Sequence, residues 1–239
     1  MADEYPINDP MLDDDRALYA QPLSDEAFAS MFAGVAAETI DAKPTLLRRL
    51  QELSTSARVG LGVGVGAGLG GLVLVMLGLR SDVNDMGLAV ALVLVFLAAL
   101  GSVSVAVSLR GMHQRPMDQF AWLVSGLTLL SPLGFASIPG FWPGGSAPPY
   151  MMPWEGACFW FGTAVAVSTA AAISLLQREG IPAVWRVLTA AGAGGCAGFV
   201  VQQMFCPAND TWHQVTAHGF LGLIASAVLL GILRLRRSG

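Results

Sequence analysis

Residues 58–79 read RVGLGVGVGAGLGGLVLVMLGL, and this stretch decides the fold class of the chain. Its only charge is Arg58, and it is long enough to cross a bilayer as a helix, which takes about 20 apolar residues. The letters GAGLGG also match the GxGxxG pattern of dinucleotide-binding proteins, but that pattern needs a preceding strand, and here it lies inside an apolar span. We therefore interpret Gly60, Gly64 and Gly68 as a stripe of small residues that packs against another helix.

Five more apolar stretches follow the first one. We place the six spans near 58–79, 86–109, 119–138, 155–176, 182–205 and 214–233. Only 13% of the residues are charged, against about 25% in soluble domains. Backbone polar groups inside a bilayer must be satisfied within the protein, which favours helices. The predicted fold is therefore all-α, a polytopic membrane protein whose six transmembrane helices occupy 57–239, with a helical cytoplasmic tail at 1–56.

Basic residues predict the orientation of these spans. They gather at four of the seven non-membrane segments: Lys43, Arg48, Arg49 and Arg58; Arg110 and Arg115; Arg178 and Arg186; Arg234, Arg236 and Arg237. The alternate loops hold only Arg80. Because basic loops stay on the cytoplasmic side, both termini are expected inside. Tryptophans mark membrane interfaces, so Trp142, Trp154, Trp160 and Trp212 are expected at the outer one, and Trp122 and Trp185 at the inner one.

The N-terminal tail is acidic, with ten of the 17 acidic residues before position 42, which argues against a nucleic-acid partner. From Ser24 a helix is predicted, whose apolar face repeats at helical spacing. That face consists of Phe28, Met31, Phe32 and Val35. A second amphipathic piece carries Leu46, Leu47 and Leu50. Such helices could lie flat on the membrane or dock into a partner's groove. The acidic opposite face of 24–41 would be repelled by anionic lipid, which favours docking.

Two cysteines, Cys158 and Cys206, are expected at similar depth on the outer side, at the start of the fourth span and the end of the fifth. A disulfide, a shared metal ion and two unpaired thiols all remain open for this pair. His213 and His218 follow Cys206 closely, and imidazole and thiolate bind the same borderline metals. We treat Cys158, Cys206, His213 and His218 as a candidate metal or redox site. Cys196 lies in mid-span and is interpreted as a packing residue.

The second half of the chain resembles the NrsF-type family of six-span bacterial anti-sigma factors, with a CarR-like layout. The resemblance rests on Trp154-Glu155-Gly156-Ala157-Cys158, on Cys206-Pro207, on a Trp and a His before the last span, and on the terminal LLGILRLRR. It implies a location in the bacterial inner membrane and an extracytoplasmic-function (ECF) sigma factor as partner of the tail. It also implies that the outer cysteines respond to metal or oxidative signals. The chain departs from the family in its longer, more acidic tail and in Phe205 directly before Cys206.

These observations favour a membrane-bound anti-sigma factor that releases its sigma factor on an external redox or metal signal. The alternatives are a small membrane transporter, a thiol-redox membrane protein and a structural subunit whose tail binds another cytoplasmic protein. The sequence contains no Ser-His-Asp arrangement, P-loop or HExxH motif, so no enzyme activity is expected. No span carries the acidic residues expected of a proton-driven transporter.

The orientation can be tested with reporter fusions. A reporter fused after Gly239 should be active in the cytoplasm, and one inserted near Gly145 should be active outside, because the arginine-rich loops stay inside. A C-terminal reporter that is active only outside would reverse the placement of both cysteines.

Overall fold

The structure is a computed structural model that describes residues 45–110, 118–142, 154–177, 184–208 and 210–238. Residues 46–239 belong to one compact unit, and residues 1–45 are assigned to another. Residues 1–44 lie outside the described residues, together with the predicted helix at 24–41 and its face of Phe28, Met31, Phe32 and Val35.

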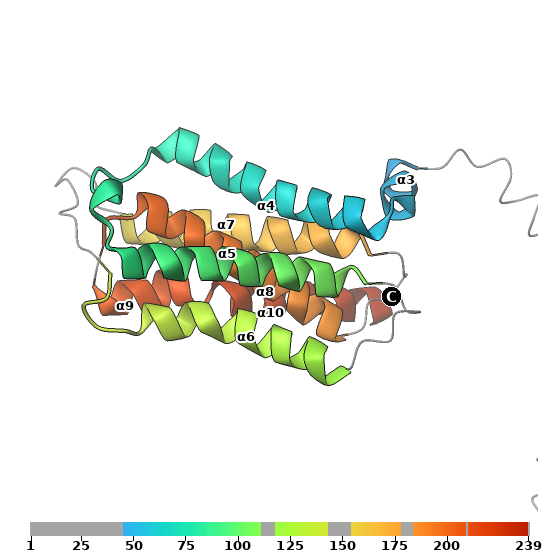
Figure 1. The fold of residues 1–239 in the computed structure, drawn as a ribbon. Helices are drawn as coiled ribbons and strands as arrows, with labels where there is room; N and C mark the ends of the chain where they lie inside the picture. Colours follow the sequence, from blue (N-terminus) through green and yellow to red (C-terminus); the bar gives the residue numbers. More distant parts are fainter. Residues whose placement is uncertain (1–44, 111–117, 143–153, 178–183, 209, 239) are drawn as a thin grey trace, which may run out of the picture. The chain divides into compact units, whose positions relative to one another are not determined.

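The described part of this unit is entirely helical (Figure 1). In chain order the elements are α3 (Leu46–Glu52), α4 (Thr55–Leu77), the short 3₁₀ helix η1 (Val83–Asp85), α5 (Leu88–Ser108), α6 (Asp118–Ala136), α7 (Trp154–Leu175), α8 (Val184–Phe205), α9 (Thr211–His213), a π-helical segment (Gln214–Gly219) and α10 (Leu221–Ser238). Six helical stretches are long and apolar enough to cross a membrane, and they confirm the predicted fold class. The sixth joins α9, the π-helical segment and part of α10 over Thr211–Leu235.

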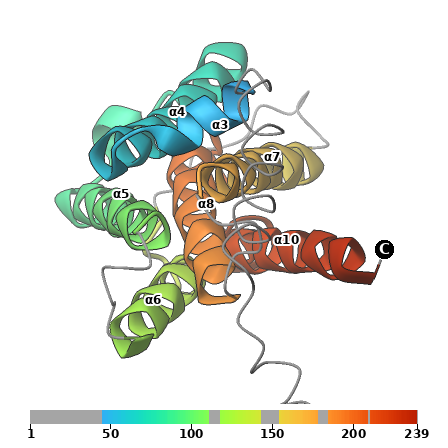
Figure 2. The same cartoon turned by 90° about the vertical axis from the view of Figure 1, so that its right-hand side faces the viewer.

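Helix α8 lies at the centre of the bundle, with α4, α5, α6, α7 and α10 around it (Figure 2). More of this span is buried than of any other, at 72% of its length. Its middle reads AAGAGGCAG at 190–198, and small side chains let neighbouring backbones come close. A Cβ atom at Gly194 would collide with the carbonyl oxygen of Ala166 in α7, and one at Gly198 would lie 2.8 Å from the carbonyl oxygen of Gly162. The close approach of α7 to α8 therefore depends on glycine.

The predicted glycine stripe on α4 has the wrong phase. A Cβ atom at Gly60, Gly64 or Gly68 would meet nothing within 4 Å. The stripe that faces the bundle is instead Gly62, Gly66 and Gly70, which are buried. Glycine occupies every second position along 60–70, so both stripes satisfy the small-xxx-small pattern. Which of the two stripes faces the bundle depends on the neighbouring helices, and the glycine pattern alone gives no information about them.

Three buried arginines bind helix ends. The Arg58 guanidinium donates to the carbonyl of Leu176 (3.0 Å), that of Arg80 donates to the carbonyl of Cys206 (3.0 Å), and that of Arg186 donates to the carbonyl of Arg110 (3.0 Å). These carbonyls follow α7, α8 and α5, whose last turns have no partners within their own helix. A cation also complements the negative end of a helix dipole. Arg58 and Arg186, which indicate topology in the sequence, therefore also bind helix ends in the bundle, and Arg80 does the same at the other end.

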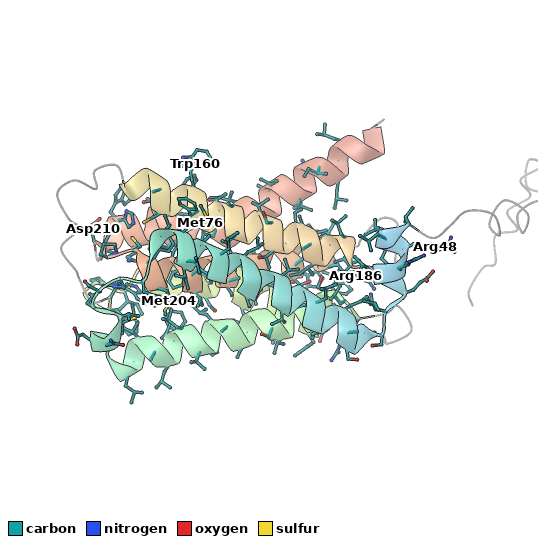
Figure 3. The ribbon with its side chains drawn as sticks, turned by 90° about the horizontal axis from the view of Figure 1, so that it is seen from above. Arg48, Met76, Trp160, Arg186, Met204 and Asp210 are labelled. Carbon is teal, nitrogen blue, oxygen red and sulfur yellow. The ribbon has the colours of Figure 1, made fainter. Side chains whose placement is uncertain are left out.

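Trp142 does not belong to the outer aromatic belt. Its side chain is 3% exposed, its indole N–H donates to the carbonyl of Phe135 (3.0 Å), and its ring packs edge-on against Phe199 of α8. The indole can be buried between α6 and α8 because its polar N–H has an acceptor. Trp160 and Trp212, by contrast, are 69% and 75% exposed, as an interfacial position requires. Figure 3 shows Trp160 on the outside of the bundle.

Leucines of α3 differ in their surroundings. Leu46 and Leu47 are exposed, whereas Leu50 packs against a buried cluster formed by α5, α7 and α8. The side chain of Gln51 donates to the carbonyl of Leu175 at the end of α7 (2.9 Å). Helix α3 is therefore attached to the bundle at the end where α7 finishes.

The phase of the α4 glycines gives a matched pair of substitutions. Gly70→Leu should destabilise the protein by about 1–3 kcal/mol, because its Cβ would lie 2.5 Å from a Val201 methyl group. Gly68→Leu, two residues away, should leave stability nearly unchanged. Thermal unfolding of both variants in detergent measures the difference. Equal losses would mean that α4 packs through another face.

Candidate metal and redox site

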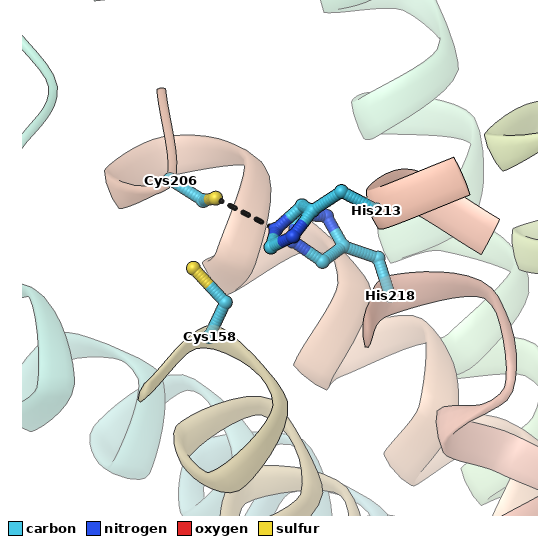
Figure 4. A group of neighbouring side chains, drawn as sticks. All are labelled: Cys158, Cys206, His213 and His218. Atoms are coloured by element: carbon cyan, nitrogen blue, oxygen red, sulfur yellow. Dashed lines mark hydrogen bonds between the residues drawn. The ribbon is translucent and has the colours of Figure 1, made fainter. Parts of the chain in front are cut away.

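Four polar side chains meet where α7 begins and α8 ends (Figure 4). Cys158 lies in the first turns of α7, Cys206 directly follows α8, His213 ends α9, and His218 lies in the π-helical segment. One possible ligand atom from each residue lies within 4.8 Å of those from the other three. All four side chains are buried, the most exposed being His213 at 5%. We call these residues the Cys/His cluster.

Local sequence explains how Cys206 and His213 come together. Pro207 follows Cys206 and cannot continue α8, so the chain turns there. Asp210 then caps the next helix, since its carboxylate accepts from the backbone N–H of His213 (2.9 Å). This turn places the Nε2 atom of His213 at 3.3 Å from the Sγ atom of Cys206.

The π-helical segment brings the two histidines onto one face. His213 and His218 are five residues apart, and on a regular α-helix they would point about 140° apart. Hydrogen bonding from residue i to i+5 makes the turn wider, so residues five apart lie above one another. The imidazole centroids are accordingly 5.1 Å apart. A wide turn of this kind is rare and is often found at functional sites.

Backbone contacts fix both cysteines from outside the cluster. The Gln202 amide donates to the carbonyls of Cys158 and Ala217 (3.0 Å for the latter), so one side chain joins α7, α8 and the π-helical segment. Arg80 donates to the carbonyl of Cys206 and also binds both carboxylate oxygens of Asp82, each at 2.6 Å. Hydrogen bonding from Arg80 lowers the pKa of the Asp82 carboxyl, which favours its charged form.

A line of amides supports His218. The side chain of Gln214 donates to the carbonyl of Ala208 (2.6 Å), and the Gln214 oxygen accepts from the Gln203 amide. The same Gln203 nitrogen lies 2.9 Å from the Nδ1 atom of His218. All three side chains of this line are fully buried. The fixed end of the line is a carbonyl, which can only accept.

The donor set suits two kinds of chemistry. Two sulfurs and two imidazoles are the ligands of tetrahedral zinc sites and suit other borderline or soft metals. The two thiols are also close enough to pair after a small movement, because their sulfurs lie within 4.8 Å of one another. The pKa of the Cys206 thiol is lowered, first because the Cys158 thiol hydrogen-bonds to its thiolate and then because of His213. A thiolate is the form that binds metal and reacts with oxidants.

The structure therefore brings Cys158, Cys206, His213 and His218 together, whereas Cys196 lies apart in the middle of α8, with its thiol 3.6 Å from the carbonyl of Thr128. Sequence reasoning missed Gln202, Gln203 and Gln214. Two adjacent glutamines at the end of an apolar span were the available signal, because buried amides in a membrane need partners. Glu155, three residues before Cys158, has a side chain outside the described residues.

No protein-family model matches the chain, and no curated protein or solved structure is significantly similar to it.

Proximity of the Cys158 and Cys206 sulfurs predicts a selective cross-link. Mild oxidation of the full-length protein should join Cys158 to Cys206 and leave Cys196 free, since the first two sulfurs lie together and Cys196 lies apart in the middle of α8. Peptide mapping after alkylation identifies the pair, and Cys196→Ser should cross-link like the wild type. A product containing Cys196, or none at all, would contradict the placement of the sulfurs.

Proposed function

We propose that this protein is an anti-sigma factor of the bacterial inner membrane that holds an ECF sigma factor and releases it on an external metal or oxidative signal. In this proposal the N-terminal tail binds the sigma factor in the cytoplasm and the Cys/His cluster receives the signal on the outer side. Both termini are inside, in agreement with the distribution of arginines.

The observation that carries the proposal is the course of α7 between two polar ends. Cys158 lies in its first turns, and its last carbonyls accept hydrogen bonds from Gln51 of α3 and from Arg58 of α4. Residue 45 and the tail before it lead directly into α3. One helix therefore joins the Cys/His cluster to α3. Figure 3 shows Arg48 of α3 and Asp210, the residue that caps α9, at opposite ends of the bundle.

This connection suggests how release would occur. Binding of a metal ion or formation of a disulfide at the cluster would pull the start of α7 toward the end of α8. Packed helices shift as units rather than bending continuously. A shift of α7 would alter the carbonyls that α3 and α4 bind, and with them the base of the tail. The apolar face of Phe28, Met31, Phe32 and Val35, with Leu46 and Leu47 beyond it, provides the groove-binding surface.

A co-expression experiment tests the partner. An ECF sigma factor of the host, co-expressed with this chain, should sediment with membranes that contain the wild-type chain. Replacing Phe28 and Phe32 together by Ala should move it to the soluble fraction, because burial of each ring contributes about 1.5–3 kcal/mol. The matched control replaces Glu26 and Ser30 by Ala. These residues lie on the opposite side of the same predicted helix, so the sigma factor should stay in the membrane fraction. Retention by the Phe28 and Phe32 double variant would contradict the proposed surface.

A further inference from the structure

The line of amides behind His218 determines which of its ring nitrogens carries a proton. The carbonyl of Ala208 can only accept, so the nitrogen of Gln214 must face it and the oxygen of Gln214 must accept from Gln203. The Gln203 nitrogen has a second hydrogen, and the atom in front of it is Nδ1 of His218, at 2.9 Å. Nδ1 therefore accepts, and in a neutral imidazole the proton then resides on Nε2.

The opposite arrangement is disfavoured by the same contacts. If Nδ1 of His218 carried the proton, the Gln203 amide would have to turn its oxygen toward the ring. The Gln203 oxygen would then take the place of the Gln203 nitrogen and face the oxygen of Gln214. Turning Gln214 as well would place its oxygen against the carbonyl of Ala208. Two facing acceptors in a buried site lose a hydrogen bond and repel each other.

The Nε2 atom of His218 is the ring nitrogen left for the Cys/His cluster. It is fully buried and makes no hydrogen bond within the described part of the chain. A metal ligand must offer a lone pair, whereas this nitrogen offers an N–H. The nearby acceptors for that N–H are the cluster sulfurs, and a thiolate accepts hydrogen bonds from such donors.

We infer that His218 is not a metal ligand but a hydrogen-bond donor to a cysteine thiolate, and that Gln203 is the positioning residue that keeps it so. The protein ligands are then Cys158, Cys206 and His213, which leaves one coordination position open to an outside group. His213 presents its Nε2 atom to the cluster, 3.3 Å from the Cys206 sulfur, and stays in the ligand set. This inference rests on the metal-binding half of the proposed function.

A matched pair of substitutions distinguishes the two histidines. Cobalt(II), whose absorption reports thiolate ligation, is titrated into the reduced full-length protein in detergent. His213→Gln should weaken cobalt binding at least 100-fold, since a ligand is lost. His218→Gln should weaken it no more than about threefold, because the amide N–H can still donate to the thiolate. Similar losses in the two variants would overturn the inference.

Substitutions at Gln203 test the positioning role directly. Gln203→Glu provides an acceptor for Nδ1–H, as in the carboxylate–histidine–metal arrangements of many metal sites, and frees Nε2 to coordinate. It should tighten cobalt binding about tenfold and strengthen the tetrahedral visible bands. Gln203→Met keeps the volume but removes the donor, so the tautomer of His218 is no longer fixed. Unchanged cobalt spectra in the well-folded Glu variant would contradict the proposal.

The tautomer itself can be read without any metal. Nitrogen-15 NMR of histidine-labelled full-length protein should show His218 with the proton on Nε2 in the wild type, and a change to Nδ1 in Gln203→Glu. A wild-type proton on Nδ1 would overturn the inference whatever the cobalt result. Failure of the wild type to bind cobalt would overturn the metal-binding half of the proposed function, while the NMR spectrum still decides the role of Gln203.

Discussion

The close crossing of α7 and α8 is the contact on which the rest of the structure depends. Lipid chains are as apolar as leucine, so helices in a membrane are held by packing and by hydrogen bonds rather than by exclusion of water. Gly194 and Gly198 lack the Cβ atoms that would keep these two backbones apart. The two helices run antiparallel, so the start of one lies beside the end of the other. Cys158 and Cys206 come together for this reason, before any ligand is considered.

Polar groups then secure what the glycines bring together. Gln202 reaches the carbonyl of Cys158 through space that a side chain at position 162 would occupy. Arg80 holds the carbonyl of Cys206 and belongs to the segment between α4 and α5. An unsatisfied amide or carbonyl costs several kcal/mol in hydrocarbon, so each of these bonds is hard to lose. The same bonds that stabilise the bundle also position the backbone of the Cys/His cluster.

The sequence allowed the six spans to be predicted, because hydropathy and length suffice for a helix that must satisfy its own backbone. It also indicated that Cys158 and Cys206 share a depth, since depth follows from position along a span. What could not be predicted depends on rotation about a helix axis. The phase of the glycines on α4 and the burial of Trp142 are both set by neighbours distant in sequence. The π-helical segment was likewise hidden, because Gln214–Gly219 has no composition that distinguishes it from an α-helix.

That segment has a consequence for the evolution of such chains. A π-helical turn holds one residue more than the α-helical turn it replaces, so deleting one residue between His213 and His218 would restore a regular α-helix. The two histidines would then be four apart, a spacing that also places side chains on one face. The helices on either side could keep their packing. A related protein with a one-residue gap at this point could therefore carry the same four side chains in the same places. A comparison based on histidine spacing alone would not identify it as related.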